Sequence, residues 1–158
     1  MSNFDKNDFL PQAFVVLGVI TFVLNFGALP ESVPIHFGLT GHPNGWAPKP
    51  VALIVPVLAV GLYLLLSAGR ASGKFNLPWK LNDANRDQLV ELCREFLWTS
   101  NVLVSAMLAY LQWAMIQIAL HRMEGVGAWF TPVFIGGMLL LHVVYFVRGQ
   151  RIVGRAKS

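Results

Sequence analysis

Charged side chains are scarce in this chain of 158 residues: only 13% are Asp, Glu, Lys or Arg, whereas 55% are hydrophobic. A soluble domain of this length carries nearly twice that share of charge, because about a quarter of its residues cover the surface. The scarcity excludes a water-soluble domain and predicts one compact integral membrane unit. Cysteine is also nearly absent, and a single residue, Cys93, excludes an internal disulfide.

Motifs that mark enzymes are missing as well. The sequence has no Gly-rich phosphate loop, no nucleophile elbow, no paired carboxylates and no H-E-x-x-H helix. We therefore expect a protein that is not an enzyme and that needs no cofactor and no metal ion. A bound pigment, quinone or lipid stays an open alternative, because a helix bundle that contains Trp and His side chains can hold one.

Four long runs lack Asp, Glu, Lys and Arg altogether. They cover approximately residues 12–29, 51–69, 97–120 and 129–147. Each is close to the length of about 20 residues that a helix needs to cross the hydrocarbon core. The sequence therefore predicts an all-α membrane protein whose residues 1–158 form one domain, with four transmembrane helices in an antiparallel bundle.

The basic residues predict the orientation of these spans, because short loops rich in Lys and Arg stay in the cytoplasm. With four spans, ten of the 12 basic residues share one side: Lys6, Arg70, Lys74, Lys80, Arg86, Arg94, Arg148, Arg151, Arg155 and Lys157. Only Lys49 and Arg122 lie on the other side. Both termini are therefore expected in the cytoplasm, with residues 30–50 and 121–128 outside. A cleaved signal peptide in place of the first span would separate the two basic blocks, so we disfavour it.

The predicted outer loop, residues 30–50, is rich in Gly and Pro, which disfavour a helix. Residues 32–37 alternate in the manner of a short strand, and Asn44-Gly45 is a strong tight-turn dipeptide. We expect a short β-hairpin or an ordered extended loop that lies over the bundle. Trp46 and Lys49 should then mark the point where the chain enters the bilayer again.

The predicted cytoplasmic loop should contain an amphipathic helix that continues into the third span. Asn82 or Asp83 is a suitable N-cap for it. Its apolar stripe is formed by Leu89, Leu92, Cys93 and Phe96. Cys93 is interpreted as a small buried hydrophobe on that stripe. Before the helix, Phe75, Leu77 and Trp79 are expected at the level of the lipid headgroups.

The outer loop also carries a recognisable pattern: Leu29-Pro30, Val33-Pro34, His36-Phe37, Gly41, Asn44-Gly45-Trp46 and Lys49. It resembles a bacterial membrane domain of unknown function that is often found at the N-terminus of SdpI-type immunity proteins. Leu77-Pro78-Trp79-Lys80, followed by Asn85-Arg86, is similar to the segment after the second span in those relatives. The resemblance covers about the first 100 residues and implies the bacterial cytoplasmic (inner) membrane. Asn44 stands where that family usually has Asp, and the full proteins continue with further helices.

The candidate partner-binding residues all lie on the outer loop: Pro34, His36, Phe37, Gly41, Asn44, Trp46 and Lys49. A metal site is disfavoured there, because His36 and His42 lack the further ligands that zinc requires. The preferred interpretation for His36 is a structural hydrogen bond to the loop backbone. Recognition of a ligand or peptide is the alternative.

A second candidate set consists of polar residues inside the spans, which are expected to fix helix packing: Asn25, Tyr63, Ser105, Gln112 and His142. Asn25 and Gln112 have similar predicted depths, so they are expected to be able to meet. His142 is expected to be neutral and bonded to Ser105, Tyr63 or backbone. A proton relay is the less favoured alternative, because no carboxylate lies within a span.

Two functions follow from these patterns. The first, which the resemblance implies, is a non-enzymatic, SdpI-like membrane protein of immunity or signalling type that recognises a peptide, lipid or protein partner through residues 30–50. The second is a small accessory or structural subunit of a larger membrane complex, and thus a partner in a hetero-oligomer. Nucleic acid is not an expected partner, since the net charge of +4 is explained by loops that face anionic lipid.

Overall fold

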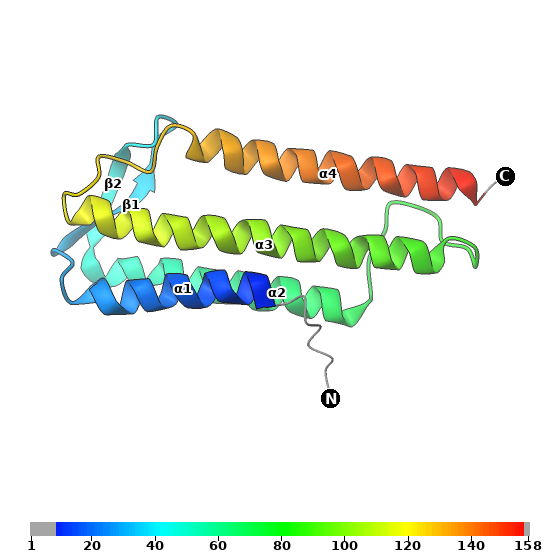
Figure 1. The fold of residues 1–158 in the computed structure, drawn as a ribbon, viewed down its shortest axis with the longest axis horizontal. Coiled ribbons are helices and arrows are strands. Elements are labelled where there is room, and N and C mark those ends of the chain that lie inside the picture. Colours follow the sequence, from blue (N-terminus) through cyan, green and yellow to red (C-terminus); the bar gives the residue numbers. More distant parts are fainter. Residues whose placement is uncertain (1–8, 157–158) are drawn as a thin grey trace.

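The computed structural model describes residues 9–156, which form four α-helices, one 3-10 helix and a two-stranded sheet (Figure 1). The elements in chain order are α1 (Phe9–Phe26), β1 (Ser32–Phe37), β2 (Pro43–Pro48), η2 (Lys49–Leu53), α2 (Ile54–Ser72), α3 (Arg86–Ala119) and α4 (Phe130–Arg155). Lys6 and Lys157, which entered the charge argument, lie outside the described residues.

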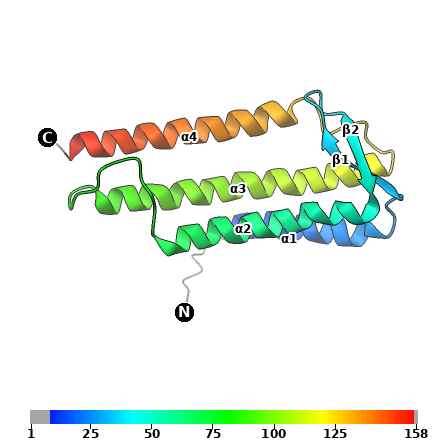
Figure 2. The same ribbon diagram turned by 180° about the vertical axis from the view of Figure 1, so that it is seen from behind.

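Helix α3 lies at the centre of the molecule. It packs on α1, on α2, on α4 and on β1, whereas α4 packs on α3 and on neither α1 nor α2 to a comparable extent. Figures 1 and 2 show α4 on the opposite side of α3 from α1 and α2. The sheet lies over one end of the helices, which we call the hairpin end. The other end holds Arg70 to Arg94 and Arg148 to Arg155, and we call it the basic end.

All four predicted apolar runs lie in helices that are long and apolar enough to cross a membrane. The boundaries differ from the prediction: α1 ends at Phe26 instead of residue 29, and α4 continues to Arg155. At a rise of 1.5 Å per residue, the 34 residues of α3 extend for about 50 Å, well beyond a hydrocarbon core of about 30 Å. The segment predicted to form an amphipathic helix that continues into the third span is the first part of α3.

The predicted strand at residues 32–37 is confirmed as β1, which pairs with β2 in antiparallel register. The prediction of a turn at Asn44-Gly45 is wrong, because both residues lie within β2 opposite β1. The turn is made instead by residues 38–41, where the N–H of Gly41 donates to the carbonyl of Gly38 at 2.9 Å. Gly41 has a φ of +82°, a conformation that suits glycine and that makes it the better turn residue.

The buried core is concentrated at the hairpin end. One cluster joins Phe22 of α1, Val33 of β1, Ala52 of η2 and the α3 residues Met115 and Ile116. By contrast, α4 contributes little to the buried core, since Gly149 is its one buried residue. Large apolar side chains on α1, α2 and α4 are exposed, as is expected where hydrocarbon takes the place of water.

Residues 73–85 connect α2 to α3, and we call them the strap. Helix α3 begins at Arg86 with Asn85 at its cap, whereas the predicted N-cap was Asn82 or Asp83. The reason is a local pair of hydrogen bonds: each of Asn82 and Asn85 accepts, on its side-chain oxygen, the backbone N–H of the other at 2.9 Å. Trp79 packs on α4, with its ring 5.8 Å from that of Phe146.

Candidate functional site

The inner face of the hairpin is fixed against the helices. Val33 is fully buried and belongs to the core cluster that includes Phe22 and Met115. Pro34 also has a fully buried side chain. Val33 thus holds β1 on α3, and the buried Pro34 beside it is part of the support of the candidate site.

The hairpin turn is tied to the loop between α3 and α4. The carbonyl oxygen of Gly41 accepts a hydrogen bond from the N–H of Val126 at 2.8 Å. A Cβ atom on Gly41 would lie 2.5 Å from the carbonyl oxygen of Gly127, so only glycine fits here. Val126 in turn offers its carbonyl to the hydroxyl of Tyr110 on α3, at 2.9 Å. The turn is therefore held by a chain of contacts that ends on the central helix.

A side-chain pair links the two strands on the exposed face. The Nδ1 atom of His36 lies 2.5 Å from the Oδ1 atom of Asn44. Because an amide oxygen only accepts, Nδ1 carries the hydrogen and donates it. Gly45 is directly opposite His36, and a Cβ atom on Gly45 would lie 2.9 Å from that of His36. The pairing explains a glycine in mid-strand, which otherwise weakens a sheet.

The side chain of Lys49 binds to backbone groups of this chain. Its Nζ atom donates to the carbonyls of Gly27 at 3.2 Å and Leu29 at 3.0 Å, just after the end of α1. It also lies 5.0 Å from the centre of the Phe26 ring. A cation at the C-terminal end of a helix interacts favourably with its dipole and its unpaired carbonyls. Lys49 therefore joins η2 to the end of α1.

The candidate residues His36, Asn44 and Trp46 are exposed, and so are Ile35 and Leu39 of the same hairpin. We call these five residues the hairpin surface. Leu39 is 82% exposed at the turn, and Trp46 is 49% exposed in β2. Phe37 lies at the border, partly buried against the cluster that contains Ala114 and Val126. Tryptophan is among the residues enriched at binding hot spots.

The two strands differ in how far they are covered. Of the described elements, β1 packs on α3 and η2, whereas β2 packs on β1 and η2. Strand β2 is thus the one farther from the helices. The outer edge of such a strand presents backbone groups that an extended peptide can pair with.

This loop is also where the chain resembles other proteins. Residues 13–60 match a family model, a domain of unknown function (DUF1648). The match covers most of α1, the whole hairpin and the first residues of α2. No curated protein and no solved structure matches the chain.

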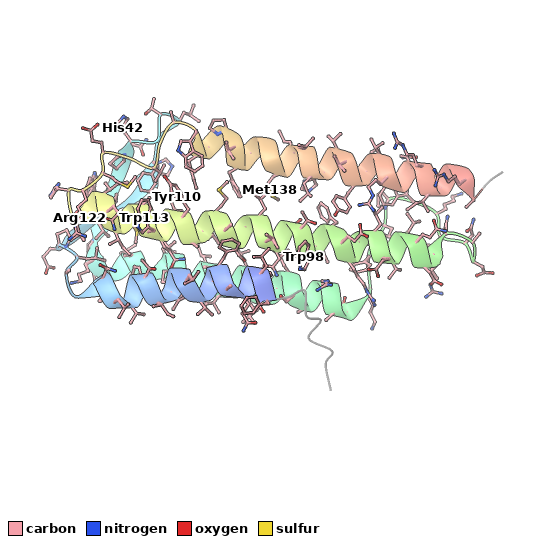
Figure 3. All side chains as sticks on the ribbon, viewed as in Figure 1. His42, Trp98, Tyr110, Trp113, Arg122 and Met138 are labelled. Atoms are coloured by element: carbon pink, nitrogen blue, oxygen red, sulfur yellow. The ribbon has the colours of Figure 1, made fainter. Side chains whose placement is uncertain are left out.

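His42 has a different neighbourhood from that of His36. Its Nδ1 atom lies 3.3 Å from the carbonyl oxygen of Glu124, so it contributes to the contact between the hairpin and the α3–α4 loop. Figure 3 shows His42 at the hairpin end, above the strands. Within residues 9–156, no three His, Cys, Asp or Glu side chains come together in a group suited to a metal ion.

Some of the polar residues of the helices form one cluster between α2 and α3. Asn101, which is 4% exposed, donates through Nδ2 to the hydroxyl of Ser67 at 3.0 Å and to the carbonyl of Tyr63 at 3.3 Å. Its Oδ1 atom accepts from the hydroxyl of Ser105 at 3.2 Å. Tyr63 and Ser105 were predicted from the sequence, whereas Asn101, which connects them, was not. Its position inside the apolar run of residues 97–120 was the available signal.

The other predicted polar residues bond within their own helices. Asn25 donates to the carbonyl of Thr21 at 2.8 Å, and Gln112 donates to that of Leu108 at 3.2 Å. The expected meeting of Asn25 with Gln112 is therefore replaced by two local bonds. Gln112 is fully buried against Gly18, where a Cβ atom would lie 2.7 Å from its Nε2 atom. The small Gly18 makes room for the amide.

His142 lies on α4, away from Ser105 and Tyr63. Its Nδ1 atom lies 2.7 Å from the carbonyl oxygen of Met138. Because a carbonyl oxygen only accepts, Nδ1 is the donor of this hydrogen bond. The edge of the Phe96 ring meets its imidazole, with centroids 5.0 Å apart. Of the predicted partners, the structure thus gives His142 a backbone carbonyl of its own helix.

An aromatic cluster at the hairpin end was not predicted. Tyr110 of α3 lies 5.0 Å from Trp129, 5.6 Å from Phe130 and 5.7 Å from Trp113, measured between ring centroids. Figure 3 shows Tyr110 and Trp113 on α3 close to the sheet. Trp129 and Trp113 are half exposed, as in the aromatic belts of membrane interfaces. The cluster gives the hairpin a rigid base.

Proposed function

We propose that this chain is a non-enzymatic, SdpI-like integral membrane protein that recognises a peptide or protein partner through residues 30–50. The observation that carries the proposal is the hairpin surface, in which Trp46 and Leu39 remain exposed on a rigidly supported sheet. Exposed apolar patches with polar rims are typical of interaction sites. A partner would pair with the outer edge of β2 and cover Trp46, in the manner of strand addition.

The proposed topology is an antiparallel four-helix arrangement with both termini in the cytoplasm and the hairpin outside. The distribution of charge supports it. Of the described basic residues, Lys49 and Arg122 belong to the hairpin end, and the other eight belong to the basic end. Under the positive-inside rule, the basic end then faces the cytoplasm. The hairpin surface would meet molecules that arrive from outside, which suits an immunity or signalling role.

The experiment compares variants in the cell that encodes the chain. A deletion strain is complemented with the wild type or with the double variant Trp46→Ala/Leu39→Ala, and survival is measured against membrane-active peptides. We expect the wild type to restore survival against at least one peptide and the double variant to fail, although both insert equally. Thr40→Ala is the control, because Thr40 is exposed in the same turn but lies outside the hairpin surface. Full protection by the double variant would contradict the proposal.

A specific feature supports the second candidate, an accessory subunit. A groove of about 540 Å³ runs along α3 between α1 and α4 and is lined by Phe14, Ala106, Gly137 and Leu140, among others. Small residues such as Gly137 allow another helix to approach closely. Substitution Gly137→Leu would fill the groove. Loss of co-migration with larger subunits after gentle extraction, with the hairpin surface intact, would favour this candidate over partner recognition.

A further inference from the structure

The basic end contains a cavity that the proposed function does not use. It has a volume of about 400 Å³ and lies between the strap, α3 and α4. Figures 1 and 2 show that the strap leaves α2 and crosses to the side of α3 that faces α4. Trp79 closes one side of the cavity, because it packs on Phe146 and on Gly149, where any Cβ atom would overlap the indole. A cavity of this size falls within the usual range for small-molecule sites.

The walls of this basic-end cavity are largely apolar. Leu77 of the strap, Leu92 and Phe96 of α3, and Phe146 of α4 contribute hydrocarbon and aromatic surface. His142 also lines it, with Nδ1 engaged by the carbonyl of Met138. Such walls suit a hydrocarbon chain better than a polar solute, because burial of apolar surface provides the binding free energy.

Basic side chains lie in the lining of the cavity and close to the strap. Lys74 belongs to the lining, and a guanidinium nitrogen of Arg94 lies 3.3 Å from the Cβ position of Gly73, at the start of the strap. The basic end as a whole holds eight basic residues, Arg70, Lys74, Lys80, Arg86, Arg94, Arg148, Arg151 and Arg155, against the acidic residues Asp83, Asp87, Glu91 and Glu95. Glu95 is paired with Arg148 at 2.8 Å, and Glu91 with Arg94 at 3.9 Å. The excess charge favours an anionic headgroup.

We propose that the basic-end cavity binds one anionic phospholipid from the surrounding bilayer. One acyl chain occupies the space between Phe96 and Phe146, and the phosphate lies at the ammonium group of Lys74. Basic pockets between transmembrane helices hold anionic lipids through the same combination of contacts. The strap, which Trp79 fixes to α4, forms the outer wall of the site. This inference does not depend on the hairpin surface.

The chain provides its own reporter of occupancy. Cys93, its single cysteine, lines the cavity and is partly exposed. The full chain is reconstituted in nanodiscs of phosphatidylcholine, with or without phosphatidylglycerol, and alkylation of Cys93 by N-ethylmaleimide is timed. We expect phosphatidylglycerol to slow the reaction by about fivefold, a factor that corresponds to one cation at an anionic surface.

Two variants separate a bound lipid from a general effect of surface charge. Lys74→Gln should abolish the slowing, whereas Arg151→Gln, which removes the same charge from an exposed position of α4 outside the cavity lining, should keep it. The reporter Cys93→Ser/Gly154→Cys places the thiol at an open position at the end of α4 and should show little slowing. Equal rates in both lipids, or equal effects of the two charge variants, would overturn the proposal. Equal alkylation in phosphatidylcholine alone verifies that the variants are folded.

Discussion

The backbone of Gly41 is joined to that of Val126, whose N–H donates to the Gly41 carbonyl at 2.8 Å. This bond links the hairpin turn to a loop more than 80 residues later in the chain. Loops that carry functional surfaces depend on a rigid scaffold for their shape. The link therefore makes the shape of the hairpin surface depend on the connection between α3 and α4.

Substitution Gly41→Ala should destabilise the hairpin end. The new methyl group would lie 2.5 Å from the carbonyl oxygen of Gly127, at a φ of +82°. Strain at such a position costs about 1 to 3 kcal/mol, and we expect a loss of that size in the free energy of unfolding. Titration of detergent micelles with dodecyl sulfate, followed by circular dichroism, measures it.

The matched control is Gly61→Ala. Gly61 lies within α2, and a Cβ atom there would have no neighbour within 4 Å. Alanine is the better helix former, so this variant should be as stable as the wild type or slightly more stable. If both variants unfold at the same dodecyl sulfate concentration, the close approach at Gly41 does not limit stability.

Lys49→Met should weaken the joint between η2 and the end of α1. Methionine keeps the apolar stem but loses the two hydrogen bonds to the carbonyls of Gly27 and Leu29. Hydrogen bonds that involve a charged group contribute about 1.5 to 3 kcal/mol, and partial exposure places this case at the low end of that range. Arg122→Met, which removes an exposed cation at the same end, should leave the unfolding free energy nearly unchanged.

Patterns local in sequence predicted much of the fold. The four apolar runs and the strand at residues 32–37 were visible because hydrophobicity and alternation are read directly from neighbouring residues. The prediction of a turn at Asn44-Gly45 was wrong, because turn propensity is a local preference that the pairing of two strands can override. Gly45 is needed for the close approach of His36, and the sequence does not reveal that partner.

The candidate sites were predicted less completely than the helices. Lys49 was assigned to a partner, but its ammonium group reaches back to carbonyls about 20 residues earlier, a contact that depends on the path of the chain. The basic-end cavity was missed for the same reason. Leu77 and Phe146 are almost 70 residues apart, and only the crossing of the strap to α4 brings them together.

Gly149→Leu should open the basic end. Leucine would overlap the indole of Trp79, so the strap must leave α4 and the cavity loses one wall. In phosphatidylcholine nanodiscs, we expect Cys93 to react several times faster with N-ethylmaleimide than in the wild type, because the strap no longer restricts access to it. Gly154→Leu is the control, since position 154 has open space around it. Unchanged reactivity of Cys93 in the Gly149 variant would show that the strap is not held by this contact.

Asn101→Ala should loosen the packing of α2 on α3. The buried amide of Asn101 donates one hydrogen bond to Ser67 and one to the Tyr63 carbonyl, and its removal breaks these two hydrogen bonds between α3 and α2. Hydrogen bonds between transmembrane helices contribute about 0.6 to 2 kcal/mol, and the unfolding free energy should fall by that amount. A double-mutant cycle with Ser67→Ala isolates the pair. A coupling energy near zero would assign the loss to the cavity left by Asn101, whereas a clear coupling would show that the bond itself positions α2.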